Sequence, residues 1–182
     1  MELDTILFNK EDLQFSRIET NNYKLTFSME NSNIILSKII NFELIQMIYS
    51  LNPDVYEKVE LEKNGNDTEA VITLVMKHFF EDLGLVQRFS FIRIKKIIEE
   101  NRILFVGQSI KSYRPSGIPE KSELMSLENM TVVCDIITPH KIQFSINILF
   151  DKSMNIPTFV EKVVGVILFK IFKRVKHFVE NV

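Results

Sequence analysis

Residues 155–182 read NIPTFVEKVVGVILFKIFKRVKHFVENV, a long apolar segment that opens close to a proline. Pro157 suits the first turn of a helix, and Thr158 and Glu161 have the spacing of a capping box. Lysines gather on one side of this helix. At about 100° per residue, the other side is a wide apolar face made of Val160, Val164, Ile167, Leu168, Ile171, Val175, Phe178 and Val182. The pattern predicts one long amphipathic helix whose apolar face covers a sheet.

The chain before this helix predicts one strand, two short helices and six further strands. Apolar and polar residues alternate over residues 22–30, which is the period of a half-buried strand. Helical spacing over residues 31–52, with Asn31, Ser32 and Asn33 as candidate caps and Pro53 as a terminator, predicts the two helices. Short polar turns then separate strand-like segments, so the sheet is expected to be an antiparallel meander. These segments cover residues 55–63, 68–80, 86–98, 103–113, 130–138 and 142–150.

Two stretches do not fit this pattern. Residues 1–20 have weak periodicity and predict an arm or a short edge strand. Residues 114–129 contain Pro115, Gly117 and Pro119, so they predict one long loop.

Composition predicts a single globular domain over residues 1–182, since 46% of the residues are apolar and 25% are charged. A net charge of −2, without a basic stripe, argues against nucleic acid as a partner. The single cysteine, Cys134, cannot form a disulfide within the chain, and the acidic N-terminus lacks an export signal. We therefore expect a cytoplasmic protein. The longest apolar run of the final helix, Val163 to Phe169, is far shorter than the roughly 20 residues that cross a bilayer.

The order of one strand, a helical pair, six antiparallel strands and a long helix resembles the helix-grip fold of the START-related (SRPBCC) lipid-transfer superfamily. The resemblance covers nearly the whole chain, and the proline-initiated helix at Asn155-Ile156-Pro157-Thr158-Phe159-Val160 is similar to that of many members. It implies an α+β fold with order β-α-α-β6-α, in which a seven-stranded curved antiparallel sheet wraps around the C-terminal helix. It also implies a cavity between sheet and helix for lipids, sterols or other apolar ligands, and in some members catalysis or protein contact.

Within this fold, apolar strand and helix positions are candidates for lining the cavity. Arg93 follows Phe89 and Phe91 on one strand face, where its guanidinium could anchor a carboxylate or phosphate. The same strand face could instead be solvated, as charged residues usually are. The predicted ligand-binding residues are Phe89, Phe91, Arg93, Phe105, Phe144, Ile146, Ile148, Ile167 and Ile171.

Catalytic, metal and cofactor sites are not predicted. His78, His140 and His177 lack metal-ligand spacing, and Cys134 alternates with apolar residues as a buried strand residue does. We therefore expect a protein that binds without catalysis and needs no cofactor.

Two functions remain open. The first is binding of a hydrophobic or amphipathic small molecule under the final helix, with the 114–129 loop and the 31–52 helices at the entrance. The second is a structural or protein-interaction module with a filled groove that docks a partner through the outer face of the final helix. Phe159, Val166 and Phe169 fall toward that outer face, where they could touch a protein or, transiently, a membrane. Alternatively, they pack under the N-terminal arm or the 114–129 loop.

Overall fold

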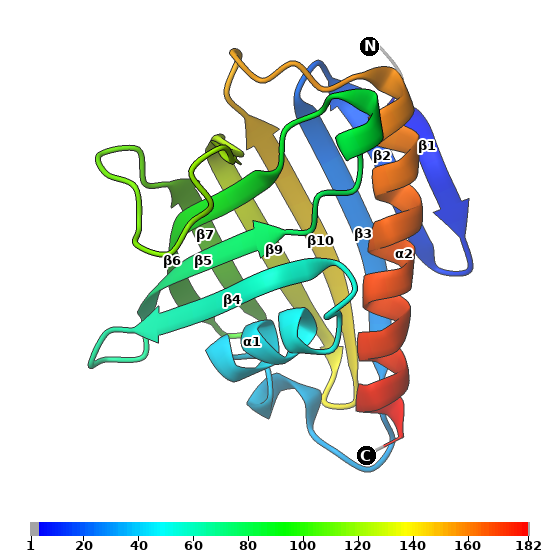
Figure 1. Cartoon of the computed structure of the whole chain (residues 1–182). Coiled ribbons are helices and arrows are strands. Elements are labelled where there is room, and N and C mark those ends of the chain that lie inside the picture. The colour runs from blue at the N-terminus through cyan, green and yellow to red at the C-terminus, as the bar shows by residue number, and fades with distance from the viewer. Residues whose placement is uncertain (1–3, 182) are drawn as a thin grey trace.

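The structure is a computed structural model that describes residues 4–181 (Figure 1). Its helices are α1 (Phe42–Ser50) and α2 (Thr158–Glu180), with short 3-10 turns η1 (Leu36–Lys38) and η2 (Glu81–Leu83). The strands are β1 (Thr5–Lys10), β2 (Leu13–Glu19), β3 (Asn22–Glu30), β4 (Tyr56–Lys63), β5 (Glu69–Met76), β6 (Arg88–Glu99), β7 (Arg102–Ser109), β8 (Glu123–Leu124), β9 (Leu127–Thr138) and β10 (Lys141–Phe150).

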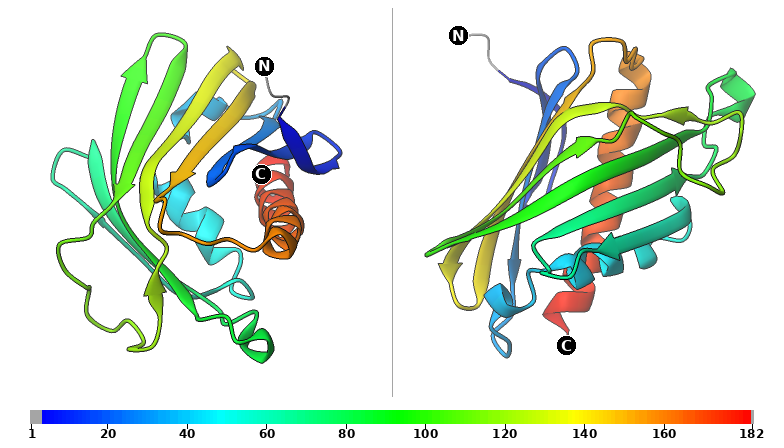
Figure 2. Two further views of the ribbon diagram at one scale, coloured as in Figure 1. Left: turned by 90° about the horizontal axis from the view of Figure 1, so that it is seen from above. Right: turned by 90° about the vertical axis from the view of Figure 1, so that its left-hand side faces the viewer.

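All of these strands belong to one curved sheet. Nine lie in the order β1-β2-β3-β10-β9-β7-β6-β5-β4, each antiparallel to its neighbour, and β8 pairs in parallel with β6. Figure 2 shows that the sheet curves around a space in which α1 lies, and that α2 runs along the open side near β3. The predicted antiparallel sheet and long C-terminal helix are confirmed. The predicted number of seven strands is wrong, because the described part of the chain forms a ten-stranded sheet.

The three additional strands come from the two stretches with weak periodicity. β1 and β2 form a hairpin within residues 1–20, where a bulge between Ile6 and Phe8 breaks the alternation of faces. In β2, Ser16 is as buried as its apolar neighbour Phe15, so polarity does not follow burial there. β8 contains only two residues and is too short to carry a periodic signal.

The β1–β2 hairpin packs against α2. The rings of Phe8 and Phe169 lie with their centroids 5.6 Å apart. A Cβ atom added to Gly165 would lie only 2.6 Å from the Cβ of Phe8. Glycine inside a helix costs about 1 kcal/mol relative to alanine, so the close approach of β1 accounts for a glycine at this position.

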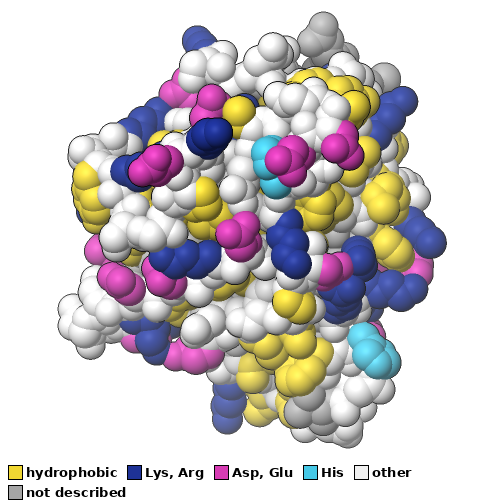
Figure 3. All heavy atoms as spheres, in the orientation of Figure 1, with side chains coloured by type: hydrophobic (Ala, Val, Ile, Leu, Met, Phe, Trp, Pro, Cys, Tyr) yellow, Lys and Arg dark blue, Asp and Glu magenta, His cyan; other side chains and the backbone are white. Residues whose placement is uncertain are grey.

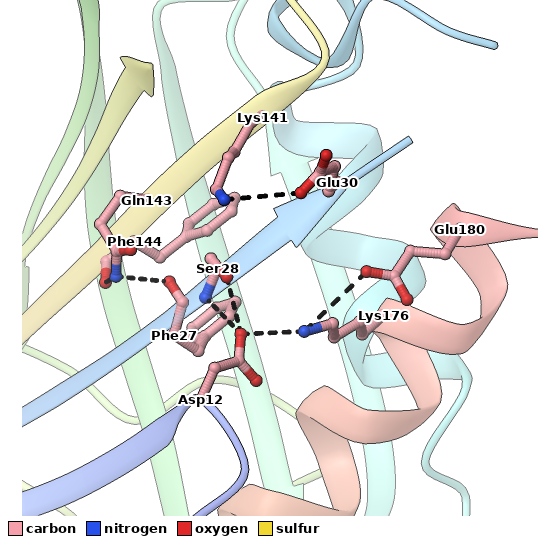
Figure 4. A network of polar contacts seen from close by, with 9 residues as sticks. All are labelled: Asp12, Phe27, Ser28, Glu30, Lys141, Gln143, Phe144, Lys176 and Glu180. Carbon is pink, nitrogen blue, oxygen red and sulfur yellow. Dashed lines mark hydrogen bonds and ion pairs between the residues drawn. The ribbon is translucent and has the colours of Figure 1, made fainter. Parts of the chain in front are cut away.

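The turn between β1 and β2 also binds the C-terminal half of α2 (Figure 4). The carboxylate of Asp12 accepts hydrogen bonds from the backbone N–H and the hydroxyl of Ser28, at 3.1 and 2.7 Å. The same oxygen accepts a hydrogen bond from Lys176 Nζ at 2.8 Å. One side chain therefore joins the hairpin to both β3 and α2.

The helical region within residues 31–52 begins later than the sequence predicts. Asn41, and not Asn31, caps α1, since its side chain accepts a hydrogen bond from the backbone N–H of Leu44 at 3.0 Å. Asn31 is buried and donates from Nδ2 to the carbonyl of Val179 at 2.6 Å, which holds the last turn of α2.

The buried stripe of α2 differs from the predicted apolar face. Its buried residues are Glu161, Gly165, Ile171, Val175 and Val179. Phe178, predicted to be buried, is 46% exposed. The stripe includes Glu161 and Gly165 because α2 packs against the β1–β2 hairpin at the edge of the sheet as well as against β3. The predicted capping box is absent, because the residue preceding α2 is Pro157 and its N-terminus has no side-chain cap.

Candidate ligand-binding site

The two faces of the sheet carry separate apolar clusters. The main cluster lies on the concave face and includes Phe105, Phe144 and, from α2, Val175 and Val179. The second cluster, built around Val75, Phe89, Phe91 and Ile118, lies on the opposite face. Residues near 110–124 cover it, so the predicted long loop packs on the outside of the sheet instead of forming an entrance next to α2.

The structure divides the predicted ligand-binding residues between these faces. Phe105, Phe144, Ile146 and Ile148 belong to the main cluster on the concave face. Ile167 and Ile171 of α2 are half-buried and buried, respectively, and lie outside the residues that form that cluster.

Phe89, Phe91 and Arg93 lie on the other face, apart from the remaining predicted residues. The Phe91 ring contacts Tyr113 with centroids 5.2 Å apart, and the Arg114 guanidinium lies 4.7 Å above the ring of Phe89. Arg93 is exposed. Periodicity did not reveal this division because the first half of β6 is buried on both faces, with Phe89 and Phe91 on one and Ser90 and Ile92 on the other.

The concave side is filled at one end and accessible at the other. Ile142 and Phe144 of β10 are buried, whereas Ile146 and Ile148 further along the same strand are partly exposed. Partial exposure is unexpected in β10, which has β3 and β9 as neighbours on its two sides. Six of the partly exposed apolar residues that pack against the main cluster define what we call the concave site: Met130, Val132, Ile146, Ile148, Val164 and Leu168. Figure 3 shows apolar side chains at the molecular surface among charged ones.

Two tyrosines at the corner between α1 and β4 were not singled out by the sequence. Tyr49 and Tyr56 pack against the main cluster with their rings nearly perpendicular and their centroids 5.0 Å apart. Burial raises the pKa of Tyr49 to about 12. Burial, together with the neighbouring Tyr49, also raises the pKa of Tyr56. Both side chains nevertheless keep some accessible surface.

These tyrosines predict a loss of stability in alkali. The folded protein retains hydroxyl protons that an unfolded chain, with a tyrosine pKa of about 10, releases. The stabilisation is therefore complete below pH 10 and is lost as the pH rises toward 12. We expect the urea midpoint to fall between pH 8 and pH 11.5, and to fall less in Tyr49→Phe. The exposed Tyr113, replaced by phenylalanine, is the control, and an equal pH response in all three proteins would contradict the prediction.

A buried carboxylate joins the N-terminal half of α2 to the sheet. Glu161 is 4% exposed and accepts hydrogen bonds from Tyr23 Oη at 2.7 Å and Arg17 Nη1 at 2.8 Å. A cavity of about 120 Å³ lies beside it, lined by Arg17, Thr20, Asn21, Tyr23, Met154, Asn155, Ile156, Thr158 and Glu161. That volume suits a few water molecules and is smaller than the roughly 300 Å³ of the smallest common ligand pockets.

An ionic bridge connects the middle of α2 to the corner after α1. Asp54 pairs with both Lys170 and Arg174, and Arg174 Nη1 also donates to the buried Asn52 Oδ1 at 2.9 Å. The guanidinium of Arg174 and the ammonium of Lys170 hold the pKa of Asp54 well below its usual range. The bridge therefore persists at neutral pH.

Within residues 4–181, no cluster of three or more His, Cys, Asp or Glu side chains has the arrangement of a metal site. None of the described helices is long and apolar enough to cross a membrane. The free cysteine, Cys134, is buried, and burial raises the pKa of its thiol to about 12.

No protein-family model and no curated protein sequence matches the chain. Solved structures, by contrast, match it over nearly its full length. Human STARD10 has a TM-score of 0.68 at 10% identity, covering 96% of this chain and 71% of that one. A fragment of the STAR-related lipid transfer protein from Xanthomonas axonopodis has a TM-score of 0.68 at 11% identity, covering 96% of this chain and 97% of the other. Human StAR-related lipid transfer protein 5 has a TM-score of 0.66 at 14% identity, covering 97% and 88%.

The chain has the START-type helix-grip fold. This fold confirms the resemblance read from the order of elements. The concave site lies on the same side of the sheet as α2. The β1–β2 hairpin packs against that helix.

Proposed function

We propose that this START-type domain binds a hydrophobic or amphipathic, lipid-like small molecule at the concave site without catalysing a reaction. The observation that carries the proposal is the partial exposure of apolar side chains on central strands of the sheet. Solved structures with the same fold include proteins named for lipid transfer, which supports the same ligand class.

Burial of hydrocarbon supplies the affinity in this proposal. At about 25 cal/mol per Å², a ligand that buries ~300 Å² of apolar area gains about 7.5 kcal/mol before the cost of association. Ile146, Ile148 and Leu168 offer such surface. The predicted residues Phe105 and Phe144 are buried in the main cluster. The roles of Phe89, Phe91 and Arg93 in binding remain predictions.

Neighbouring valines on β9 provide a matched test. Val132 pairs with Ile146 on the concave face, and Val133 pairs with Ser145 and points to the other face. We expect Val132→Phe to reduce lipid taken up from phosphatidylcholine vesicles at least about 5-fold, because the larger ring occupies the ligand's space, while Val133→Phe changes uptake little. Native mass spectrometry measures the bound lipid. Absence of lipid in the unaltered protein, or equal effects of the two substitutions, would overturn the proposal.

Exposed apolar residues on α2 favour the alternative, a module that docks a protein partner. Phe159, Val163 and Val166 are 46%, 36% and 55% exposed, whereas Phe169 packs on Phe8 of the N-terminal hairpin. This alternative predicts that Val166→Asp abolishes complex formation and that Val132→Phe has no effect on function. We also propose that a membrane is a further, transient partner of the same exposed residues.

The proposal treats residues 1–182 as one domain in the cytoplasm. The described strands form one sheet, and the single cysteine is buried and unpaired. A free thiol suits a reducing compartment.

A further inference from the structure

The cavity beside Glu161 is built by three segments that are far apart in the sequence. The turn between β2 and β3, the link before α2 and the first turn of α2 meet at one end of the molecule (Figure 1). Asn21 is 7% exposed and fixes this arrangement, because its Nδ2 donates to the carbonyls of Asp151 and Met154 at 3.0 and 2.9 Å. The walls of the cavity are therefore held in place by hydrogen bonds of the fold itself.

The charged groups that line the cavity cancel each other. Arg17 Nη1 donates to Glu161 Oε2 at 2.8 Å, and Glu161 is 4% exposed. A ligand group with one net charge would meet a like charge at this pair. An uncharged polar group meets no such repulsion.

The same pair has hydrogen-bonding capacity left for a ligand. A carboxylate offers about four acceptor positions, and a guanidinium offers several N–H donors. Within residues 4–181, the Glu161 side chain accepts one hydrogen bond from Tyr23 and one from Arg17, and the Arg17 side chain donates only that one. Hydroxyl groups both donate and accept, as water does, so they can use both kinds of remaining position.

Two residues of the cavity are direct neighbours of the concave site. Tyr23 lies opposite Ile148 in the pairing of β3 with β10, and such partners have Cβ atoms about 5 Å apart. Glu161 precedes Val164 by one turn of α2, a spacing that places Cβ atoms about 5–6 Å apart. The polar cavity and the concave site therefore adjoin each other between α2 and the sheet.

The size of the cavity limits what it can hold. Its volume is about 120 Å³, which equals roughly four water molecules at about 30 Å³ each. A whole lipid does not fit, but a group of the bulk of glycerol does. The cavity is therefore suited to one end of an amphipathic molecule.

We propose that this cavity binds the uncharged, hydroxyl-bearing end of a lipid, such as the glycerol end of an acylglycerol, whose hydrocarbon chain lies against the concave site. This inference rests on the proposed function and specifies its ligand class. Arg17 donates to the hydroxyl groups and Glu161 accepts from them. Tyr23 lies at the boundary between the polar and the apolar part of the ligand.

The test uses two probes, radiolabelled 1-monooleoylglycerol and methyl oleate, each supplied in phosphatidylcholine vesicles. Both carry the same oleoyl ester, and only the first carries glycerol hydroxyls. Uptake is measured for the unaltered chain, for Asn155→Leu and for Thr158→Val, which change exposed residues of the cavity wall and leave the buried ion pair intact. Asn66→Leu and Thr68→Val are the matched controls, since both residues lie between β4 and β5, at the opposite edge of the sheet.

We expect the unaltered protein to take up monooleoylglycerol at least about 5-fold more strongly than methyl oleate. Each cavity variant should lower the uptake of monooleoylglycerol about 3- to 10-fold, as the loss of one hydrogen bond implies, and leave that of methyl oleate unchanged. The controls should match the unaltered protein with both probes.

The other outcomes separate this inference from the proposed function. Equal uptake of the two probes by the unaltered protein, or equal effects of the cavity and control variants, would overturn the inference and leave the proposed function standing. Stronger uptake of oleate than of monooleoylglycerol would also overturn it, because a carboxylate brings a net charge. Displacement of monooleoylglycerol by an equal concentration of free glycerol would show a polyol site instead of a lipid site. Failure to take up any of the lipid probes would overturn both proposals.

Discussion

Replacement of Glu161 by alanine is expected to lower the free energy of unfolding by about 3 kcal/mol. Removal of one partner from a buried ion pair leaves the other uncompensated, which typically costs about 3–5 kcal/mol. Arg17 is 33% exposed, and water can therefore solvate part of the freed guanidinium, so the lower end of that range applies. Tyr23 would also lose the acceptor of its 2.7 Å hydrogen bond.

Urea unfolding measures this loss, and two further variants interpret it. Glu161→Gln keeps an acceptor for Tyr23 without the charge, so it should lose less than Glu161→Ala. Lys162→Ala changes the exposed neighbour on the same helix and should stay within about 0.5 kcal/mol of the unaltered protein. If Glu161→Ala were as stable as Lys162→Ala, Glu161 would not be holding α2 to β2 and β3.

Replacement of Arg174 by alanine is expected to lower the free energy of unfolding by about 2 kcal/mol. The substitution leaves the fully buried Asn52 Oδ1 without its donor and leaves Asp54 paired only with Lys170. An unsatisfied buried acceptor costs about 1–3 kcal/mol, and the exposed part of the bridge adds less than about 1 kcal/mol.

The same substitution should also change ligand exchange, since Arg174 joins α2 to the corner that carries Tyr49 and Tyr56. We expect bound phosphatidylcholine to leave Arg174→Ala several-fold faster than the unaltered protein, as measured by transfer to acceptor vesicles. Lys173→Ala is the matched control, because Lys173 is exposed and its contact with Glu11 is 3.5 Å long. Equal stability and equal release in the two variants would refute the bridge as a restraint on α2.

Local sequence patterns predicted most of the large elements. Strands β3 and β10 were predicted almost to the residue, because alternation is clear where one face is buried and the other is polar. Residues 1–20 were predicted only as an arm or a short edge strand. The bulge in β1 and the buried Ser16 of β2 break the alternation there. Of the predicted ligand-binding residues, Phe144, Ile146 and Ile148 lie on the concave face with Phe105. Phe89, Phe91 and Arg93 do not, because β6 is buried on both faces at that point and its alternation does not tell which face is concave.

The amino-acid sequence by itself determined the α+β class, the antiparallel order of the meander and the long terminal helix, since periodicity and turn residues are local properties of a chain. The tertiary structure alone decided which face of β6 belongs to the main cluster, why Glu161 and Gly165 belong in a buried stripe, and that Tyr49 and Tyr56 meet. The physical reason is that burial and pairing depend on what a side chain packs against, and its contacts come from segments far away in the sequence.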